Sequence, residues 1–279
     1  MRLSILIVNW NTTELLGDCL RSIAKYPPSA DYEIVVVDNA SGDFREPEFA
    51  AEFPNVRLIA NAENAGYAKG NNQAIEASTG DFVLLLNPDT EVTDGAIEAL
   101  LDFMDRQPDA AAVGAKLVRP SGEIDRSVRG FPYPGSIAAE FLGLSRLFPK
   151  SKALGAYRMT SFAYNEEAEV DQPMGSCLML SAKAIDEVGL FDEQFPIFFN
   201  EVDWLYWARQ KGYKVYFTPK AVVVHHGGAG TSQANRRRMI HESHDSLVRF
   251  YEKHFRGSLW PPIYHFTVAC IRLGRLLRS

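Results

Sequence analysis

Cysteine is scarce in this 279-residue sequence, which contains Cys19, Cys177 and Cys270 and no others. The three lie far apart and form no Cys-x-x-Cys pair, so they give no support to a zinc site, and an odd, sparse set suggests reduced thiols in a cytosolic compartment. An excess of positive charge is also missing, since 29 basic residues face 35 acidic ones and the net charge is −6. This balance argues against nucleic acid as a partner, because nucleic-acid binders neutralise many phosphates with lysine and arginine.

Long apolar segments are absent as well. No stretch approaches the roughly 20 apolar residues that a membrane-spanning helix needs. The apolar run Leu3–Val8 is soon interrupted by Asn9 and Asn11, whereas a signal peptide has a basic region, a longer apolar stretch and a small-residue cleavage site. We therefore expect this run to be a buried first strand and the protein to be cytoplasmic.

What the sequence does contain is a regular alternation of strands and helices over its first 120 residues. Short apolar runs predict strands at Leu3–Val8, Ile34–Val37, Val56–Ile59, Phe82–Leu86 and Ala111–Val118. Helix-spaced apolar residues predict helices at Thr13–Lys25, Tyr67–Ser78 and Thr93–Arg106. The alternation predicts an α/β fold, with a mostly parallel central sheet that helices cover on both faces. Ligands of such sheets bind beyond the C-terminal ends of the strands.

The second half of the sequence is less regular. Glycine and proline punctuate residues 119–172, which we expect to form an irregular excursion over the site, with a short helix at Glu140–Phe148. Order resumes at Met174–Leu180, and it continues with predicted helices at Ala182–Val188 and Glu201–Lys211, strands at Lys214–Phe217 and Ala221–Val224, and a helix from Ser232 to about Phe255. Pro261 and Pro262 break the pattern before a last helix.

Polar side chains follow three of the predicted strands directly. The first strand ends at Asn9, the second at Asp38, and the strand Phe82–Leu86 is followed by Asn87-Pro88-Asp89. Because strands of one parallel sheet end at the same edge, we expect these clusters to converge. The plainer interpretation is that Asn and Asp start turns or cap helices there.

Asp89 is a natural ligand for a divalent cation. Mg²⁺ or Mn²⁺ prefers carboxylate oxygen and can share diphosphate oxygens of a substrate as its other ligands. His225 follows the predicted strand Ala221–Val224 directly. A histidine at a strand end can be structural, but together with Asp89 it could complete a metal site.

The segment Asn64–Asn72 has features of a phosphate- or sugar-binding turn. Gly66 allows close approach of the backbone, and a helix beginning near Tyr67 offers N–H groups to an anion. The segment matches neither the P-loop nor the dinucleotide fingerprint. Gly70 lies inside the predicted helix, where it costs stability unless close packing requires it.

Two carboxylates, Glu201 and Asp203, open a predicted helix behind the aromatic pair Phe198-Phe199. Carboxylates at this position are favoured by the helix dipole, which is the structural interpretation. In an aromatic-lined setting they could instead supply a general base.

Together these residues resemble the large inverting family-2 glycosyltransferases, which have the A-type glycosyltransferase fold, and within them the rhamnosyltransferase-like enzymes of bacteria. The matching pieces are Val8-Asn9-Trp10-Asn11, Val37-Asp38-Asn39-Ala40-Ser41-Gly42-Asp43, Asn64-Ala65-Gly66-Tyr67-Ala68, Leu86-Asn87-Pro88-Asp89, Gly189-Leu190-Phe191-Asp192-Glu193, Glu201-Val202-Asp203-Trp204 and His225-His226-Gly227-Gly228. The resemblance runs from about Leu3 to Phe255, and the order and spacing of the set make it specific.

The resemblance implies a role for each position. The donor nucleotide sugar would be bound by Asn9, Asp38, Gly66, Asn71 and Asn87. Asp89 matches the last acid of the family's Asp-x-Asp metal motif, and His225 matches a histidine that approaches the metal or the diphosphate. Glu201 matches the catalytic carboxylate. Asn87 replaces the first acid of the metal motif, which leaves weaker or different metal dependence open. Asn200 replaces the first acid of the catalytic carboxylate pair, which leaves Asp203 open as the base.

The implied reaction is an inverting transfer of a sugar, such as rhamnose, from a nucleotide-diphosphate donor to a glycan or lipid-linked acceptor in cell-envelope polysaccharide synthesis. Residues 1–230 would form the catalytic domain and residues 231–279 a helical extension. The alternatives are a sugar nucleotidyltransferase on the same sheet and a non-catalytic carbohydrate- or lipid-binding scaffold. Loss of the base or the metal acid would favour the scaffold, and both are present.

The C-terminal segment Ile263–Leu277 is apolar but too short to span a bilayer. Arg272, Arg275 and Arg278 recur every third residue, within one side of a helix. Basic residues opposite an apolar face predict an interfacial helix on the inner face of the cell membrane, near a lipid-linked acceptor. The alternatives left open are packing of this helix on the domain and a homodimer contact.

Overall fold

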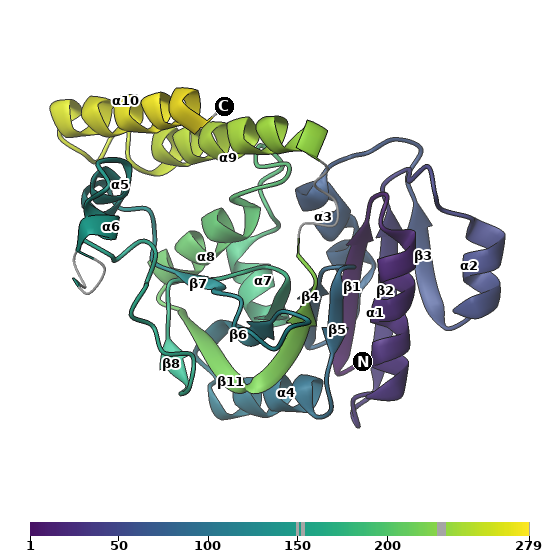
Figure 1. Ribbon diagram of the computed structural model, residues 1–279. Helices are drawn as coiled ribbons and strands as arrows, with labels where there is room; N and C mark the ends of the chain where they lie inside the picture. Colours follow the sequence, from purple (N-terminus) through teal and green to yellow (C-terminus); the bar gives the residue numbers. More distant parts are fainter. Residues whose placement is uncertain (149–150, 152–153, 228–232, 279) are drawn as a thin grey trace.

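The computed structural model describes residues 1–148, 151, 154–227 and 233–278 (Figure 1). The first part of the chain forms β1 (Leu3–Asn9), α1 (Thr13–Lys25), β2 (Tyr32–Asp38), α2 (Glu46–Glu52), β3 (Val56–Ala60), α3 (Tyr67–Ala77), β4 (Phe82–Leu86), β5 (Thr90–Val92), α4 (Ala96–Arg106) and β6 (Ala110–Val118). The second part forms β7 (Val128–Arg129), α5 (Pro134–Phe141), α6 (Leu144–Leu147), β8 (Ala168–Glu169), β9 (Gln172–Pro173), β10 (Cys177–Ser181), α7 (Ala182–Val188), α8 (Asn200–Gln210), β11 (Lys214–His225), α9 (Gln233–His254) and α10 (Pro261–Arg278).

The strands form one central sheet in the order β3-β2-β1-β4-β10-β6-β11-β5, with β8 paired to β11. All pairs among β3, β2, β1 and β4 are parallel, whereas β10 runs antiparallel between β4 and β6. The sheet is therefore less uniformly parallel than the sequence predicted. The cause is that β10 follows the irregular excursion and begins at the C-terminal ends of the parallel strands. Its first residue, Cys177, therefore lies opposite Leu86, the last residue of β4.

Helices cover the sheet on both faces, as predicted, because strand residues alternate in direction. Ile5 and Ile7 of β1 pack in one buried cluster with residues of α1 and α4. Leu6 and Val8 face the other way and pack in a second cluster with residues of α3, α8 and α9. The predicted α/β fold with a C-terminal helical extension is confirmed.

Several boundaries differ from those the sequence predicted. α4 begins at Ala96 rather than Thr93, because the Thr93 hydroxyl donates to the Val222 carbonyl instead of capping the helix. The two strands predicted at Lys214–Phe217 and Ala221–Val224 form the single strand β11. Its pairing with β6 shifts register between Thr218 and Val222. The helix expected at Glu140–Phe148 is replaced by α5 and α6, and α2 and β5 were not predicted.

The C-terminal helices pack on the rest of the molecule along one edge (Figure 1). Phe250 and Tyr251 of α9 are fully buried, and the Tyr251 hydroxyl donates to the Pro132 carbonyl. α10 packs on α9 and α5 through Val268 and Ile271.

Within the described ranges, none of the helices has the length and apolar character needed to cross a membrane. The predicted boundary after residue 230 falls in the undescribed range 228–232 and stays a prediction.

Candidate active site

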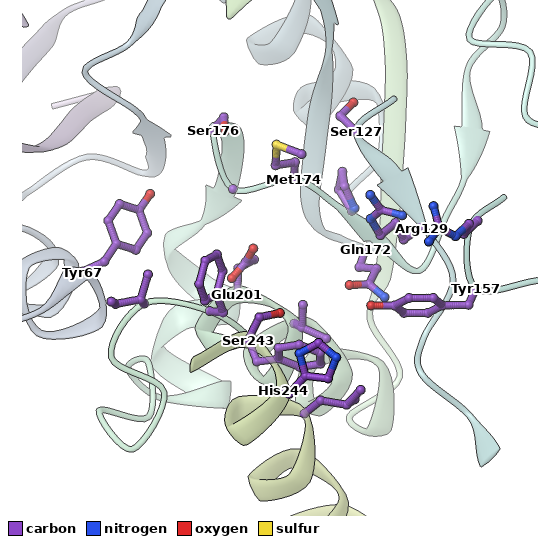
Figure 2. A pocket seen from close by; sticks show the side chains of 18 of the residues that line it. Tyr67, Ser127, Arg129, Tyr157, Gln172, Met174, Ser176, Glu201, Ser243 and His244 are labelled. Carbon is purple, nitrogen blue, oxygen red and sulfur yellow. The ribbon is translucent and has the colours of Figure 1, made fainter. Parts of the chain in front are cut away.

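A cavity of about 660 Å³ opens at the ligand end of the sheet. Its floor and one wall come from the end of β4, the start of β10, the end of β11 and the first turn of α8. Residues 127–129 and 157–158, together with α5 and α9, form the opposite wall (Figure 2). Among the predicted site residues, those that line it are Asn87, Asp89, Glu201 and His225.

A chain of hydrogen bonds joins four elements along the first wall. The Tyr67 hydroxyl at the start of α3 donates to Asn87 Oδ1 at 2.9 Å, and Asn87 Nδ2 donates to Ser176 Oγ at 3.1 Å. Ser176 Oγ lies 3.4 Å from His225 Nε2. Burial raises the pKa of the Tyr67 phenol, so it remains a donor at neutral pH. The wall is therefore fixed before any ligand arrives. Tyr67 and Ser176 were not predicted as site residues.

His225 stands between two carboxylates. Its Nδ1 lies 2.8 Å from Asp125 Oδ2, and its Nε2 lies 3.6 Å from Asp89 Oδ1. A carboxylate only accepts, so Nδ1 carries the proton that Asp125 binds, and Nε2 faces Asp89 and the Ser176 hydroxyl. This carboxylate–histidine arrangement is the kind that orients a metal-ligating imidazole. No signal in the sequence had pointed to Asp125.

The donor set fits a hard divalent cation that shares its coordination with a substrate. Asp89 offers a carboxylate oxygen and His225 an imidazole nitrogen, and both residues line the cavity. Within the part of the chain that is described, no group of three or more His, Cys, Asp or Glu side chains could hold a metal. Mg²⁺ in particular binds through one or two protein ligands and completes its shell with waters and phosphate oxygens.

Glu201 presents its carboxylate to the cavity from the first turn of α8 (Figure 2). Phe199 precedes the helix in the left-handed region, with φ of 70°, and turns the chain into it. Burial raises the pKa of Glu201, and N–H groups of the backbone, including that of Gly175, oppose the rise in part. A carboxylate whose pKa is raised and whose side chain lines the cavity is suited to act as a general base.

The neighbouring Asn200 has a structural explanation. It is fully buried, donates to the Ile197 carbonyl at 2.9 Å and accepts the Glu201 N–H at 2.9 Å. An amide can do both at once, whereas an ionised carboxylate cannot donate. Asn200 therefore holds the turn before α8 and does not face the cavity.

Asp203 lies outside the cavity, so the structure does not bring it together with Glu201. Its carboxylate is 4% exposed and pairs with two residues of α9, His254 at 2.6 Å and Lys253 at 2.8 Å. Lys253 also pairs with Asp192 at 2.6 Å. These contacts tie α8 to α9. Of the two carboxylates, Glu201 alone faces the cavity.

Asn9 and Asp38 meet at the ends of β1 and β2, as predicted, but both are buried beside the cavity rather than in its lining. Asn9 Nδ2 donates to Asp38 Oδ1 at 2.8 Å, and the Ser41 N–H donates to Asp38 Oδ2 at 3.0 Å. Asn9 is 0% exposed. Its direct contacts are thus with protein groups that shape the β2–α2 loop.

The turn before α3 differs from the predicted anion site. Gly66 has φ of 90°, and a Cβ there would lie 3.1 Å from the Pro196 carbonyl oxygen, so glycine is required. However, the first N–H groups of the helix, those of Tyr67 and Ala68, donate to that same carbonyl. They are not free for a phosphate. Asn71 is buried and donates to the Tyr67 carbonyl, while Gly70 allows α3 to pack on Val8.

The opposite wall carries residues that sequence reasoning missed. Arg129, Tyr157, Arg158 and Ser127 all belong to the segment 119–172, whose sequence has no periodicity to reveal which side chains point inward. Arg158 pairs with the buried Glu140.

Comparison with known proteins identifies the family. The sequence model for glycosyl transferase family 2 matches residues 4–171. The chain belongs to this family and is a glycosyltransferase, in agreement with the resemblance seen in its motifs.

The relatives agree with a rhamnosyltransferase-like branch. An N-acetylglucosaminyl-diphospho-decaprenol L-rhamnosyltransferase of Mycobacterium tuberculosis (strain CDC 1551 / Oshkosh) is 30% identical over 72% of this chain and 68% of that protein. The low-salt glycan biosynthesis hexosyltransferase Agl10 of Haloferax volcanii is 26% identical over 76% of this chain and 63% of its own.

Solved structures confirm the fold. A mannosyltransferase from Pyrobaculum calidifontis, in complex with GDP-Man and Mn²⁺, superposes with a TM-score of 0.62 at 18% identity, covering 98% of this chain and 73% of the other. S. aureus TarS 1–349 gives a TM-score of 0.60 at 14% identity, covering 99% and 71%. At these identities the likeness concerns the fold alone.

Proposed function

We propose that this glycosyltransferase moves a hexose of the rhamnose type, with inversion, from a nucleotide-diphosphate donor to a hydroxyl of a lipid-linked glycan acceptor. The observation that carries the proposal is Glu201, a partly buried carboxylate that lines the cavity and whose pKa is raised. It lies between the wall with Asp89 and His225 and the opposite wall with Arg129. The name of the mycobacterial relative, an N-acetylglucosaminyl-diphospho-decaprenol L-rhamnosyltransferase, supports both the sugar and the lipid-linked acceptor. The process that we propose for this reaction is cell-envelope polysaccharide synthesis.

In this proposal Glu201 accepts the proton of the acceptor hydroxyl while the hydroxyl oxygen attacks the anomeric carbon. The bond from that carbon to the diphosphate oxygen breaks on the opposite face. The leaving group departs as a nucleoside diphosphate, and one displacement inverts the anomeric configuration. The raised pKa supports this role, because a base whose pKa approaches the working pH transfers protons most effectively.

A divalent metal is the proposed cofactor. Asp89 and His225 Nε2 would hold it, with Asp125 fixing the histidine tautomer. When bound, Mg²⁺ or Mn²⁺ would neutralise the negative charge that develops on the leaving diphosphate. Asn87, held by Tyr67 and Ser176, would orient the ribose or diphosphate from the same wall.

The remaining donor contacts are proposed in two groups. Asp38 and Gly66 would approach the nucleoside, since Asp38 ends β2 and Gly66 directly precedes Tyr67, which lines the cavity. Asn9 and Asn71 would act as positioning residues, since Asn9 binds Asp38 and Asn71 binds the backbone of Tyr67.

Substitution of the base tests the function. Glu201→Gln is expected to bind the donor normally and to lose transfer by about 10²–10⁴-fold, measured as release of nucleoside diphosphate with a panel of nucleotide sugars and a lipid-linked acceptor. Asp203→Asn is the matched control and should keep its turnover per folded molecule. Normal turnover in Glu201→Gln, with inactive Asp203→Asn, would move the base to Asp203.

We further propose that α10 holds the enzyme on an anionic membrane surface. The packing of α10 on α9 and α5 is the alternative left open by the sequence, yet a second apolar face of the helix stays exposed. This C-terminal apolar face consists of Trp260, Ile263, Phe266 and Leu273, which are 44–69% exposed. It borders an apolar groove of about 530 Å³ between α5 and α10.

Basic residues accompany this face. Arg256 and Arg272 are exposed, while Arg275 pairs with Asp245 at 2.7 Å; the side chain of Arg278 lies outside the described residues. Exposed aromatic and aliphatic residues beside arginine are typical of helices that lie in the interface of anionic bilayers. The surface would place the cavity near a lipid-linked acceptor on the inner face of the cell membrane.

Flotation with anionic and neutral liposomes tests the surface. The wild type should float with anionic liposomes at low salt, and the triple variant Trp260→Ser, Phe266→Ser, Leu273→Ser should not. Ile124→Ser with Leu190→Ser is the control, because these side chains are similarly exposed elsewhere. A wild type that remains in solution and dimerises in light scattering through the same residues would assign the face to a homodimer instead.

A further inference from the structure

Two side chains of the opposite wall line the cavity from β7 and from the residue directly before it. Ser127 and Arg129 flank Val128 at β7, and both line the cavity. Val128 between them is buried, and its backbone N–H donates to the Tyr164 hydroxyl. The alternation of a strand thus aims a hydroxyl and a guanidinium in one direction.

Arg129 differs from the other arginine in the lining. Arg158 is paired with Glu140, which also binds Ser145. No ion pair or side-chain hydrogen bond of Arg129 is found within the described ranges, although it is only partly exposed. A guanidinium has five donors and remains charged at all relevant pH values, so a half-buried one without a carboxylate is suited to an anionic ligand.

Ser127 gives an independent sign of a missing ligand. Its side chain is 3% exposed, and its Oγ has no hydrogen-bond partner. A buried hydroxyl left without a partner costs stability. Together, the unpartnered hydroxyl and the unpaired guanidinium have the donor chemistry of a phosphate site.

The position of this pair distinguishes the two substrates. Figure 2 shows Arg129 and Tyr157 on one side of Glu201 and Tyr67 on the other, and Tyr67 is linked to Ser176 by hydrogen bonds through Asn87. The latter side holds Asp89 and His225 and is the proposed donor wall. An anion bound at Arg129 therefore lies on the acceptor side of the base. Apolar residues of α5 and α9, Ile137 and Leu247, line the cavity there as well.

We propose that Arg129 and Ser127 form a subsite for the phosphate of an acceptor in which the sugar is joined to a lipid through a phosphate or diphosphate. The apolar lining contributed by α5 and α9 receives the first part of the lipid, and α5 continues to the groove beside α10. The inference rests on the proposed transfer to a lipid-linked acceptor and assigns the side chains that recognise it.

Calorimetry with farnesyl diphosphate, with farnesol as the uncharged counterpart, tests the subsite without any turnover. The wild type should bind farnesyl diphosphate more tightly than farnesol, and inorganic pyrophosphate should compete. Arg129→Gln should weaken binding of farnesyl diphosphate by about 10–100-fold, as expected for a lost hydrogen bond to a charged group, and Arg129→Lys should recover part of it. Arg119→Gln, an exposed arginine outside the cavity, is the control of equal charge change.

A second variant separates ligand binding from a structural role. Ser127→Ala should raise the Tm of the free protein, because an unpartnered hydroxyl is removed, and should still weaken farnesyl diphosphate binding. A structural hydroxyl would lower Tm instead, which would contradict the proposal.

Binding of nucleoside diphosphate with Mn²⁺ keeps the two proposals apart. It should be unchanged in Arg129→Gln. If this variant lost nucleotide binding and kept farnesyl diphosphate binding, Arg129 would belong to the donor site and the inference would be wrong, while the transfer reaction tested by Glu201→Gln would stand. Equal affinities of Arg129→Gln and wild type for both ligands would also overturn it.

Discussion

The two walls of the cavity differ in how their polar side chains are bonded. On the donor wall, Tyr67, Asn87, Ser176 and His225 form a connected series of contacts that ends at Asp125. On the opposite wall, the Ser127 hydroxyl has no partner and Arg129 no ion pair within the described residues. A wall whose groups bind one another is preorganised, whereas the other has donors that a ligand must satisfy.

The difference follows from how each wall is built. The donor wall stands at the ends of strands that are hydrogen-bonded on both sides within the central sheet, so its side chains have little freedom. The opposite wall is carried by a two-stranded sheet, β7 with β9, and by irregular chain. A preorganised wall suits a donor that is bound in the same way at each turnover, and the second wall suits recognition of one acceptor among several.

The largest effect is expected on the donor wall, at Asp89. Asp89→Ala should remove the metal-dependent binding of a nucleoside diphosphate and lower transfer by roughly 10³-fold, because the metal's stabilisation of the leaving group amounts to several kcal/mol. Calorimetry with Mn²⁺ and with a chelator measures this.

Glu91→Ala is the control for Asp89, since Glu91 lies two residues away and pairs with His226 outside the cavity. If the wild type bound nucleoside diphosphate equally well with the metal chelated, the metal role of the donor wall would be wrong.

A second effect should appear in stability rather than in turnover. Asp203→Ala leaves the buried His254 side chain without its carboxylate and Lys253 with Asp192 alone, and the loss of a hydrogen bond to a charged group costs about 1.5–3 kcal/mol. Urea unfolding should show this loss, while the folded fraction keeps its turnover. A stable but inactive Asp203→Ala would place Asp203 in the reaction and end the distinction drawn between it and Glu201.

The sequence predicted the donor wall better than the opposite wall for a physical reason. Apolar runs that end in Asn9, Asp38 and Asn87 reveal where buried strands reach the edge of a sheet, and parallel pairing makes neighbouring ends converge. The same logic pointed to Asp89, whereas Glu201 was predicted from carboxylates that open a helix; both line the cavity, and their roles stay predictions. The sequence did not distinguish a side chain in the cavity from one beneath it, so Asn9 and Asp203 were placed in the site although their partners are protein groups.

The irregular segment 119–172 depends on contacts between distant parts of the chain. Asp125 reaches His225 across 100 residues, and Glu140 is neutralised by Arg158 from another loop. Neither pairing leaves a periodic pattern in the sequence. The antiparallel β10 was also missed as such, because a short apolar run does not reveal its direction.

A smaller effect is expected at Asp125, where the donor wall meets the irregular segment. Asp125→Asn should weaken the affinity for Mn²⁺ in the presence of nucleoside diphosphate by about 10–100-fold, as substitutions of residues that orient metal ligands do. Asn can accept the Nδ1 proton but has no negative charge to strengthen the imidazole. Unchanged metal affinity would mean that the contact with His225 at 2.8 Å is structural only.

The smallest effect concerns the pH dependence of Glu201, which lies between the walls. Burial raises the pKa of Glu201 in the folded protein, so the neutral carboxyl group favours folding. This contribution to stability is fully present below the pKa of glutamate in the unfolded chain, about 4.3. It is lost as the pH rises through the pKa of Glu201 in the folded protein. Glu201→Gln should therefore have a higher Tm than the wild type at pH 8, with a difference that shrinks toward pH 4. In the wild type, kcat/KM should fall on the acid side at a pH above that of an ordinary glutamate. Glu76→Gln, at an exposed carboxylate, should show no such pH-dependent difference in Tm; an identical profile in both variants would show that the site does not destabilise the ionised base.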